Sequence, residues 1–169
     1  MLEDHHRLDS LRSLYSTGSP LKPDAFDFVY NHIKKDVMLS SITGGTDLCS
    51  LFAGCNPVLP VYRGEIQSAC LGMSIQAWKG QDHPVLGERG DLVCTKVFPS
   101  QPVYFWNDPD GARYRSAYFD VYKHVWCHGD FVWINPNTKG LVMLGRSDGT
   151  LNPGGVRFGS AELYTIGEC

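Results

Sequence analysis

The middle of the chain constrains the fold most, because between Val58 and Leu144 short β-like runs alternate with clusters of Gly, Pro, Asn and Asp. Two of these clusters, residues 108–111 and 135–140, end in a glycine, the residue that adopts a positive φ most easily in a turn. Runs of this length and spacing are typical of an antiparallel sheet or a small barrel. The predicted strands are residues 61–66, 73–78, 91–95, 131–134 and 142–144.

The N-terminal part has a different pattern, a helix followed by a strand. Between Lys22 and Lys35 apolar residues recur at the spacing of one helical face, and Pro23 suits the first turn of a helix. The apolar run 37–42 is typical of a buried strand, and it leads into the glycine-rich segment 43–47. Ligands of α/β proteins collect at the carboxyl ends of strands, so this segment is a candidate site. The apolar residues of the helical face are Phe26, Val29, Tyr30 and Ile33.

The C-terminal part changes pattern again beyond Asp148. Residues 150–158 predict a hairpin, and residues 160–163 predict the start of a capped helix. That helix has about one turn before the sequence stops, so we expect a chain truncated at both ends. The predicted parts are residues 1–57 from an α/β nucleotide-binding subdomain, residues 58–147 from a β-rich subdomain, and residues 148–169 from a hinge and the beginning of a C-terminal domain.

Composition excludes several classes of protein. With 43% hydrophobic and 20% charged residues the chain can fill a core, so it is not a disordered protein. A net charge of −3 gives no reason to expect a nucleic-acid partner. No apolar run reaches the roughly 20 residues of a membrane span, and the polar start carries no secretory signal. We therefore expect a cytosolic protein.

The cysteines lack the spacing of zinc ligands. No C-x-x-C pair occurs among the 6 cysteines, and neither Cys127–His128 nor His5–His6 has a second pair at ligand distance in the sequence. A chain with normal apolar content does not need disulfides, so we predict reduced and mostly buried thiols.

Three polar clusters could carry chemistry. In residues 44–47 (Gly-Gly-Thr-Asp), glycines would let the backbone approach a phosphate, and the carboxylate could hold Mg²⁺. In residues 126–130, the carboxylate of Asp130 suits the paired hydroxyls of a ribose. Arg146 and Arg157 stand in glycine-rich loops and fit phosphate or ribose recognition. The same clusters also have structural interpretations: a strand-end turn, a β-turn aspartate, and a hairpin with solvated arginines.

In this order and at these separations, the clusters resemble the adenylate-forming superfamily of acyl-CoA synthetases, adenylation domains and luciferases. In closer detail the chain resembles the acetoacetate–CoA ligase family. The likeness runs from about Leu8 to Tyr164 and is carried by the stretches SSITGGTDLCSLFAGCNPVLPVYRGEIQ and HGDFVWINPNTKGLVMLGRSDGTLNPGGVRFGSAELY. It implies a truncated adenylate-forming fold, in which an α/β piece is followed by an antiparallel sheet or barrel and by the start of a small α+β domain.

The resemblance implies ATP, CoA and Mg²⁺ as cofactors and acetoacetate as the substrate. An acid attacks the α-phosphorus of ATP to give an acyl-adenylate and pyrophosphate, and CoA then displaces AMP in a cytosolic step of lipid metabolism. The nucleotide-binding residues implied are Gly18, Ser19 and Pro20 at the adenine, Thr46 at the α-phosphate, and Asp130 and Arg146 at the ribose. Gly45 is also an implied nucleotide-binding residue. Thr46 and Asp47 are the implied catalytic residues, and Asp47 stands where the family has a magnesium-binding glutamate.

The remaining implied roles concern the acid, CoA and domain movement. Gly44 would line the acyl pocket, where its missing side chain would leave room for a four-carbon β-keto acid; Thr43 or Ser41 could donate to the keto oxygen. Asp148 would be the hinge. Gly155 would border the CoA thiol channel, and Arg157 would reach the phosphate.

Two functional motifs of the family have no counterpart in these 169 residues. They are the Ser/Thr/Gly-rich phosphate loop with its lysine and the catalytic lysine of the C-terminal domain. Three hypotheses remain open: an acetoacetate-activating ligase, a ligase for another short acid, and an inactive fragment. Such a fragment would bind nucleotide weakly or pair with another chain, such as the missing parts of the same enzyme.

Overall fold

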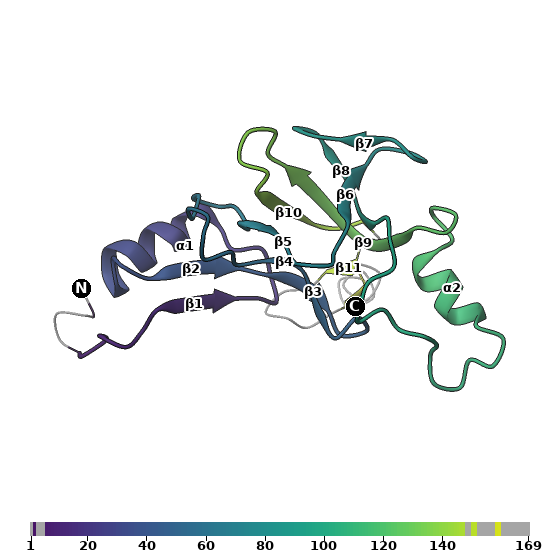
Figure 1. The fold of residues 1–169 in the computed structure, drawn as a ribbon, viewed down its shortest axis with the longest axis horizontal. Helices are drawn as coiled ribbons and strands as arrows, with labels where there is room; N and C mark the ends of the chain where they lie inside the picture. Colours follow the sequence, from purple (N-terminus) through teal and green to yellow (C-terminus); the bar gives the residue numbers. More distant parts are fainter. Residues whose placement is uncertain (1, 3–5, 148–149, 152–157, 160–169) are drawn as a thin grey trace, which may run out of the picture.

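The computed structural model describes residues 2, 6–147, 150–151 and 158–159, and its largest element is a five-stranded antiparallel sheet. The strands are β6 (Ile75–Trp78), β7 (Pro84–Val85), β8 (Arg89–Cys94), β9 (Trp126–Ile134) and β10 (Leu141–Arg146). They lie in the order β10-β9-β8-β6-β7 and fill the upper part of Figure 1. The antiparallel sheet predicted for the middle of the chain is therefore confirmed.

The β9–β10 hairpin is closed by a side chain from a distant segment. Glu65 accepts hydrogen bonds from the Asn135 amide at 2.6 Å and from the Thr138 hydroxyl at 2.6 Å, both in the hairpin turn. A Cβ atom on Gly140 would lie 2.2 Å from Oε2 of Glu65, so this glycine permits the close approach. The strand predicted over residues 61–66 is wrong: only Ile66 bridges, to Leu141, and the segment holds the turn through Glu65.

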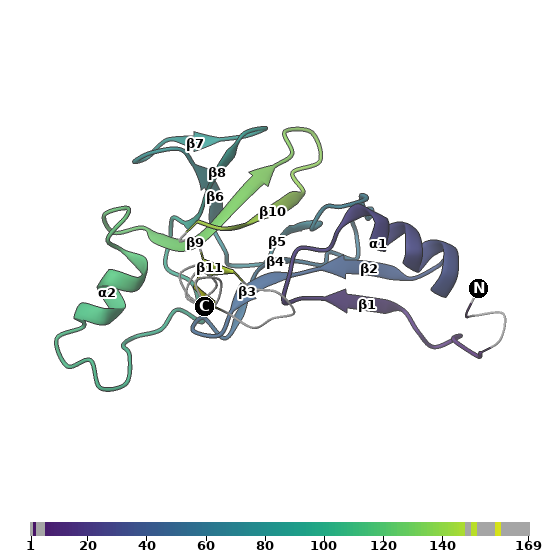
Figure 2. The same cartoon turned by 180° about the vertical axis from the view of Figure 1, so that it is seen from behind.

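The N-terminal part is a parallel strand pair connected through a helix. β1 (Ser13–Ser16) pairs in parallel with β2 (Met38–Ser41), and α1 (Pro23–Phe28) continues into a π-helical turn, η2 (Val29–Ile33). The helix and β2 follow the sequence prediction, whereas β1 was not predicted. Figures 1 and 2 show α1 beside this pair, at the end of the molecule opposite α2 (Ala112–Tyr118). Of the predicted helical face, Phe26 alone is buried.

A small antiparallel sheet connects the two parts. It consists of β3 (Thr43–Gly45), β4 (Ser50–Gly54) and β5 (Ser68–Ala69). Gly44 and Gly45 therefore lie in a strand, and the turn that follows is residues 46–49. Because β4 pairs with β5, hydrogen bonds cross the boundary predicted at residues 57/58. The three-part division of the chain stays a prediction.

The main core surrounds the indole of Trp126, which is 2% exposed. Its ring meets Phe52 and Phe98 edge-on at 6.4 and 5.4 Å between centroids. From the other side the ring of Tyr118, at the end of α2, lies flat on it at 3.6 Å. Helix α2 was not predicted; it begins after Gly111, which has a φ of 67°, and the Asp108 carboxylate accepts two of its first backbone N–H groups.

Near the C-terminus, β11 (Thr150–Leu151) pairs with β12 (Phe158–Gly159) in the predicted hairpin. The predicted helix start at residues 160–163 lies outside the described residues. Within the described residues, the five cysteines are free, with Cys94 and Cys127 buried and the other three partly or fully exposed, so the prediction of mostly buried thiols is wrong. No helix in this part of the chain has the length and apolarity to cross a membrane.

Candidate functional site

A cavity of about 600 Å³ lies where the N-terminal strands meet the β9–β10 hairpin. Eight of the predicted site residues line it: Gly18, Ser19, Pro20, Gly44, Gly45, Thr46, Asp130 and Arg146. They come from three segments that are far apart in the sequence. The wall also carries Ser41 and Thr43, the two candidate donors to a keto group. A volume of this size is typical of pockets for small molecules.

Asp130 and Arg146 form the charged wall of the cavity. They are paired across β9 and β10 at a bulge, and Nη1 of Arg146 donates to Oδ1 of Asp130 at 3.2 Å. The same nitrogen donates to the backbone oxygen of His128 at 3.3 Å. Asp130 lies within β9, so it is not a turn residue, and Arg146 is only about 15% exposed, so it is not a solvated arginine. A carboxylate oxygen has two lone-pair directions, so this pair can still accept hydrogen bonds from a diol.

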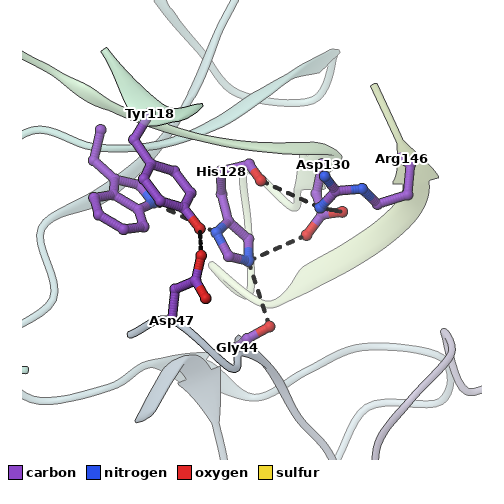
Figure 3. Close-up of polar contacts among 7 residues, drawn as sticks. Gly44, Asp47, Tyr118, His128, Asp130 and Arg146 are labelled. Atoms are coloured by element: carbon purple, nitrogen blue, oxygen red, sulfur yellow. Dashed lines mark hydrogen bonds and ion pairs between the residues drawn. The ribbon is translucent and has the colours of Figure 1, made fainter. Parts of the chain in front are cut away.

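His128 also belongs to the site, although only its sequence neighbour Asp130 was predicted. Its buried ring has Nε2 at 3.4 Å from the backbone oxygen of Gly44 and at 3.6 Å from Oδ2 of Asp130. Trp126 donates from Nε1 to Nδ1 at 3.4 Å, which places the imidazole proton of neutral His128 on Nε2. His128 therefore connects β9 to β3, as Figure 3 shows. The sequence signal was its position two residues before Asp130 on the same face of a strand.

The two glycines of β3 are required by close approaches. A Cβ atom on Gly44 would lie 2.1 Å from the backbone oxygen of Ser50 in the neighbouring strand. A Cβ atom on Gly45 would lie 2.9 Å from Cε1 of His128. Gly44 thus lines the cavity with its backbone, and its missing side chain would point at β4. The sequence argument that this glycine leaves space for the acid does not fit this geometry.

Asp47 is exposed and does not line the cavity. It lies in the turn after β3, where its carboxylate accepts a hydrogen bond from the hydroxyl of Tyr118 (Figure 3). Tyr118 comes from a helix 71 residues further along the chain, and sequence reasoning gave no signal for it.

The donor set around Asp47 fits a nucleotide-borne Mg²⁺ better than a resident metal ion. No group of three or more His, Cys, Asp or Glu side chains suited to a metal occurs among the described residues. Mg²⁺ in nucleotide sites is held by one or two carboxylates together with phosphate oxygens and waters. The single exposed carboxylate of Asp47, next to the exposed Thr46, matches that arrangement. Asp148, Gly155 and Arg157 lie outside the described residues, so their roles stay predictions.

Comparisons with known proteins show which proteins this chain is related to. No protein-family model matches the chain. Acetoacetyl-CoA synthetase of Gallus gallus is 58% identical over 163 residues, which are 96% of this chain and 24% of that protein. Acetoacetyl-coenzyme A synthetase of Rhizobium meliloti is 60% identical over 159 residues, 94% of this chain and 24% of that protein. The chain is homologous to a segment of the acetoacetyl-CoA synthetases.

The solved structure of acetoacetyl-CoA synthetase from Streptomyces lividans gives the same relationship in three dimensions. It matches this fold with a TM-score of 0.77 at 43% identity, and the match covers 96% of this chain and 25% of that chain. The fold is therefore part of an adenylate-forming fold, as the resemblance implied. The chain spans about a quarter of the length of the curated relatives it matches.

Proposed function

We propose that the cavity binds the AMP part of ATP, and that the chain supplies this site to an ATP-dependent activation of acetoacetate. One observation carries the proposal: a paired carboxylate, a threonine hydroxyl and glycine-rich backbone from three distant segments converge on one cavity. The comparisons add that relatives 58% and 60% identical to this chain are named acetoacetyl-CoA synthetases.

In the proposed complex each side chain has a role that its chemistry allows. Asp130 accepts hydrogen bonds from the ribose hydroxyls, and Arg146 neutralises that carboxylate and holds its orientation. Thr46 donates its hydroxyl to the α-phosphate, and Gly18, Ser19 and Pro20 form the wall for the adenine. Mg²⁺ bound to the phosphates would neutralise their charge, with Asp47 as its protein ligand. None of these roles needs a protein nucleophile, so the contribution is positioning and charge neutralisation.

The substrate acid belongs to the same proposal. Ser41 and Thr43 are buried and line the cavity, so their hydroxyls are available to a short acid with a polar keto group. Pocket size discriminates weakly, by about 1–3 kcal/mol for each methylene-sized difference. We therefore propose acetoacetate with some tolerance of other short acids. Binding of CoA beside Gly155, and a contact of Arg157 with the phosphate, are part of the proposal.

Nucleotide binding is tested on the chain itself by calorimetric titration with AMP. Asp130→Asn should weaken AMP binding about tenfold or more, because hydrogen bonds to a charged group contribute roughly 1.5–3 kcal/mol. The matched control is Asp120→Asn, since Asp120 is exposed and lies outside the cavity. Equal affinity for AMP in the two variants, or no AMP binding by the original chain, would contradict the proposed site.

The chemical step can be tested separately from nucleotide binding. The 169 residues contain neither the family's phosphate loop nor its terminal lysine. Loss of one preorganised donor alone costs roughly 10²–10³ in rate. We expect no acetoacetate-dependent AMP formation from ATP by the purified chain. Turnover that Asp47→Ala abolishes would instead establish the chain as a ligase.

A further inference from the structure

Tyr118 is held more rigidly than its place at the end of a short helix would suggest. Its ring is stacked on Trp126 with 3.6 Å between centroids and 12° between planes. Phe105 meets the same ring edge-on at 6.1 Å. Because Trp126 is 2% exposed and central to the core, the phenol cannot change rotamer without leaving this stack.

The hydroxyl of this fixed ring donates to the carboxylate of Asp47. Among the described residues, Tyr118 is the one side chain that forms a hydrogen bond with Asp47. An exposed aspartate in a turn ordinarily samples several rotamers, and one hydrogen bond from a rigid donor selects one of them. The bond engages Oδ2 and leaves Oδ1 available to a further ligand.

We propose that Tyr118 is the positioning residue for Asp47. The inference rests on the proposed function, in which Asp47 meets a nucleotide-borne Mg²⁺, and it goes beyond it by naming the group that sets the carboxylate in place. Removing the hydrogen-bond partner of a metal ligand commonly lowers metal affinity 10- to 100-fold. Tyr118 touches neither the metal nor the nucleotide in this scheme; it acts through Asp47.

The chain offers a closely matched pair of variants. Tyr118→Phe removes the hydroxyl and keeps the ring that packs on Trp126. Tyr114→Phe removes a hydroxyl from the same helix and the same aromatic cluster, but that hydroxyl accepts a hydrogen bond from Gln101 at 3.3 Å and is not bonded to Asp47. Any general effect of losing a tyrosine hydroxyl beside Trp126 should appear in both variants.

The first measurement is the affinity for ATP with and without Mg²⁺, and for AMP without it. We expect Tyr118→Phe to reduce the gain in ATP affinity that Mg²⁺ provides by about tenfold or more, and to leave AMP affinity unchanged. Tyr114→Phe should retain the whole gain. Equal gains in the two variants would overturn the role of Tyr118. If the original chain binds AMP but gains nothing from Mg²⁺, the metal role of Asp47 fails while the nucleotide site stands.

The second measurement needs no ligand, so it judges the positioning role even if nucleotide binding fails. The amide of Cys49 donates to the backbone oxygens of Gly45 and Thr46 at 3.1 Å, which makes its hydrogen exchange a reporter of the Asp47 turn. Tyr118→Phe should speed this exchange about tenfold, because losing one hydrogen bond to a charged group costs roughly 1.5 kcal/mol or more. Tyr114→Phe should not. Unchanged exchange in Tyr118→Phe would show that Asp47 does not depend on Tyr118.

Discussion

Gly44→Ala separates two explanations of why a glycine stands at position 44, just before the candidate phosphate contact. The glycine either permits the close approach of β4 or leaves space for the acid. Its Cβ atom would lie 2.1 Å from the backbone oxygen of Ser50, whereas real contacts of this kind start near 3.0 Å. β3 and β4 must therefore separate by about 1 Å, which lengthens their ladder hydrogen bonds beyond the usual range of roughly 3 Å. Loss of two or three such bonds, at roughly 0.5–1.5 kcal/mol each, predicts a local destabilisation of about 1–4.5 kcal/mol.

The assay is hydrogen exchange of the β3 and β4 amides, which reports local opening without requiring two-state unfolding. Each 1.4 kcal/mol corresponds to about a tenfold change, so exchange in Gly44→Ala should be about fivefold faster or more. Gly54→Ala is the control, because a Cβ there meets only side chains, the nearest at 3.3 Å, and β4 keeps its partners. Unchanged exchange in Gly44→Ala, together with weaker acetoacetate binding, would instead support a glycine that makes space for the acid.

Three further outcomes follow from groups outside the cavity. Burial, and then the Asp91 carboxylate, raise the pKa of Tyr122 to about 12. Ultraviolet absorbance should therefore show a phenol that titrates near pH 12. The stability of the folded chain should fall as the pH rises from 10 through 12. Burial would raise the pKa of Asp108, but the N–H groups of Tyr114 and Arg113 outweigh it and hold that pKa below 3.8. The contribution of Asp108 to stability is therefore present above pH 3.8 and is lost as the pH falls through the lowered pKa. Asp108→Asn should remove this part of the acid-induced loss of α2 helicity, measured by circular dichroism. Three apolar side chains are almost fully exposed: Val97 at 85%, Val103 at 86% and Trp106 at 89%. The chain should therefore bind a hydrophobic dye and melt over a broad temperature range. One sharp thermal transition without dye binding would contradict this expectation.

The sequence predicted those elements whose patterns are local. The helix at residues 22–35, the strand after it and the hairpin turn at residues 135–140 each carry their own signal in spacing or turn residues. β1 and α2 were missed because they are stabilised by residues outside their own segments. β1 exists through its pairing with β2, and α2 depends on the Asp108 cap and on packing against Trp126.

In the candidate site, too, some residues could be predicted from the sequence and others could not. Asp130, Arg146 and the segment at residues 44–46 were found because the family resemblance fixes their order along the chain, and the fold brings them to one cavity. Tyr118 could not be found in this way, since its link to Asp47 is a contact between side chains 71 residues apart. The structure also changes the interpretation of Gly44, because it shows that a side chain at this position would point at β4 and not into the cavity.

The contact of His128 with Gly44 has a consequence for when the cavity is expected to form during folding. It joins residues 84 apart, while the β9–β10 hairpin joins close neighbours in sequence. Closing a loop of that length costs about 4 kcal/mol of chain entropy, so we expect the local hairpin to form before the cavity does. The proposed nucleotide would then bind only molecules that have passed the folding barrier. Such a ligand should lengthen the lifetime of the folded chain while leaving the rate of its formation unchanged.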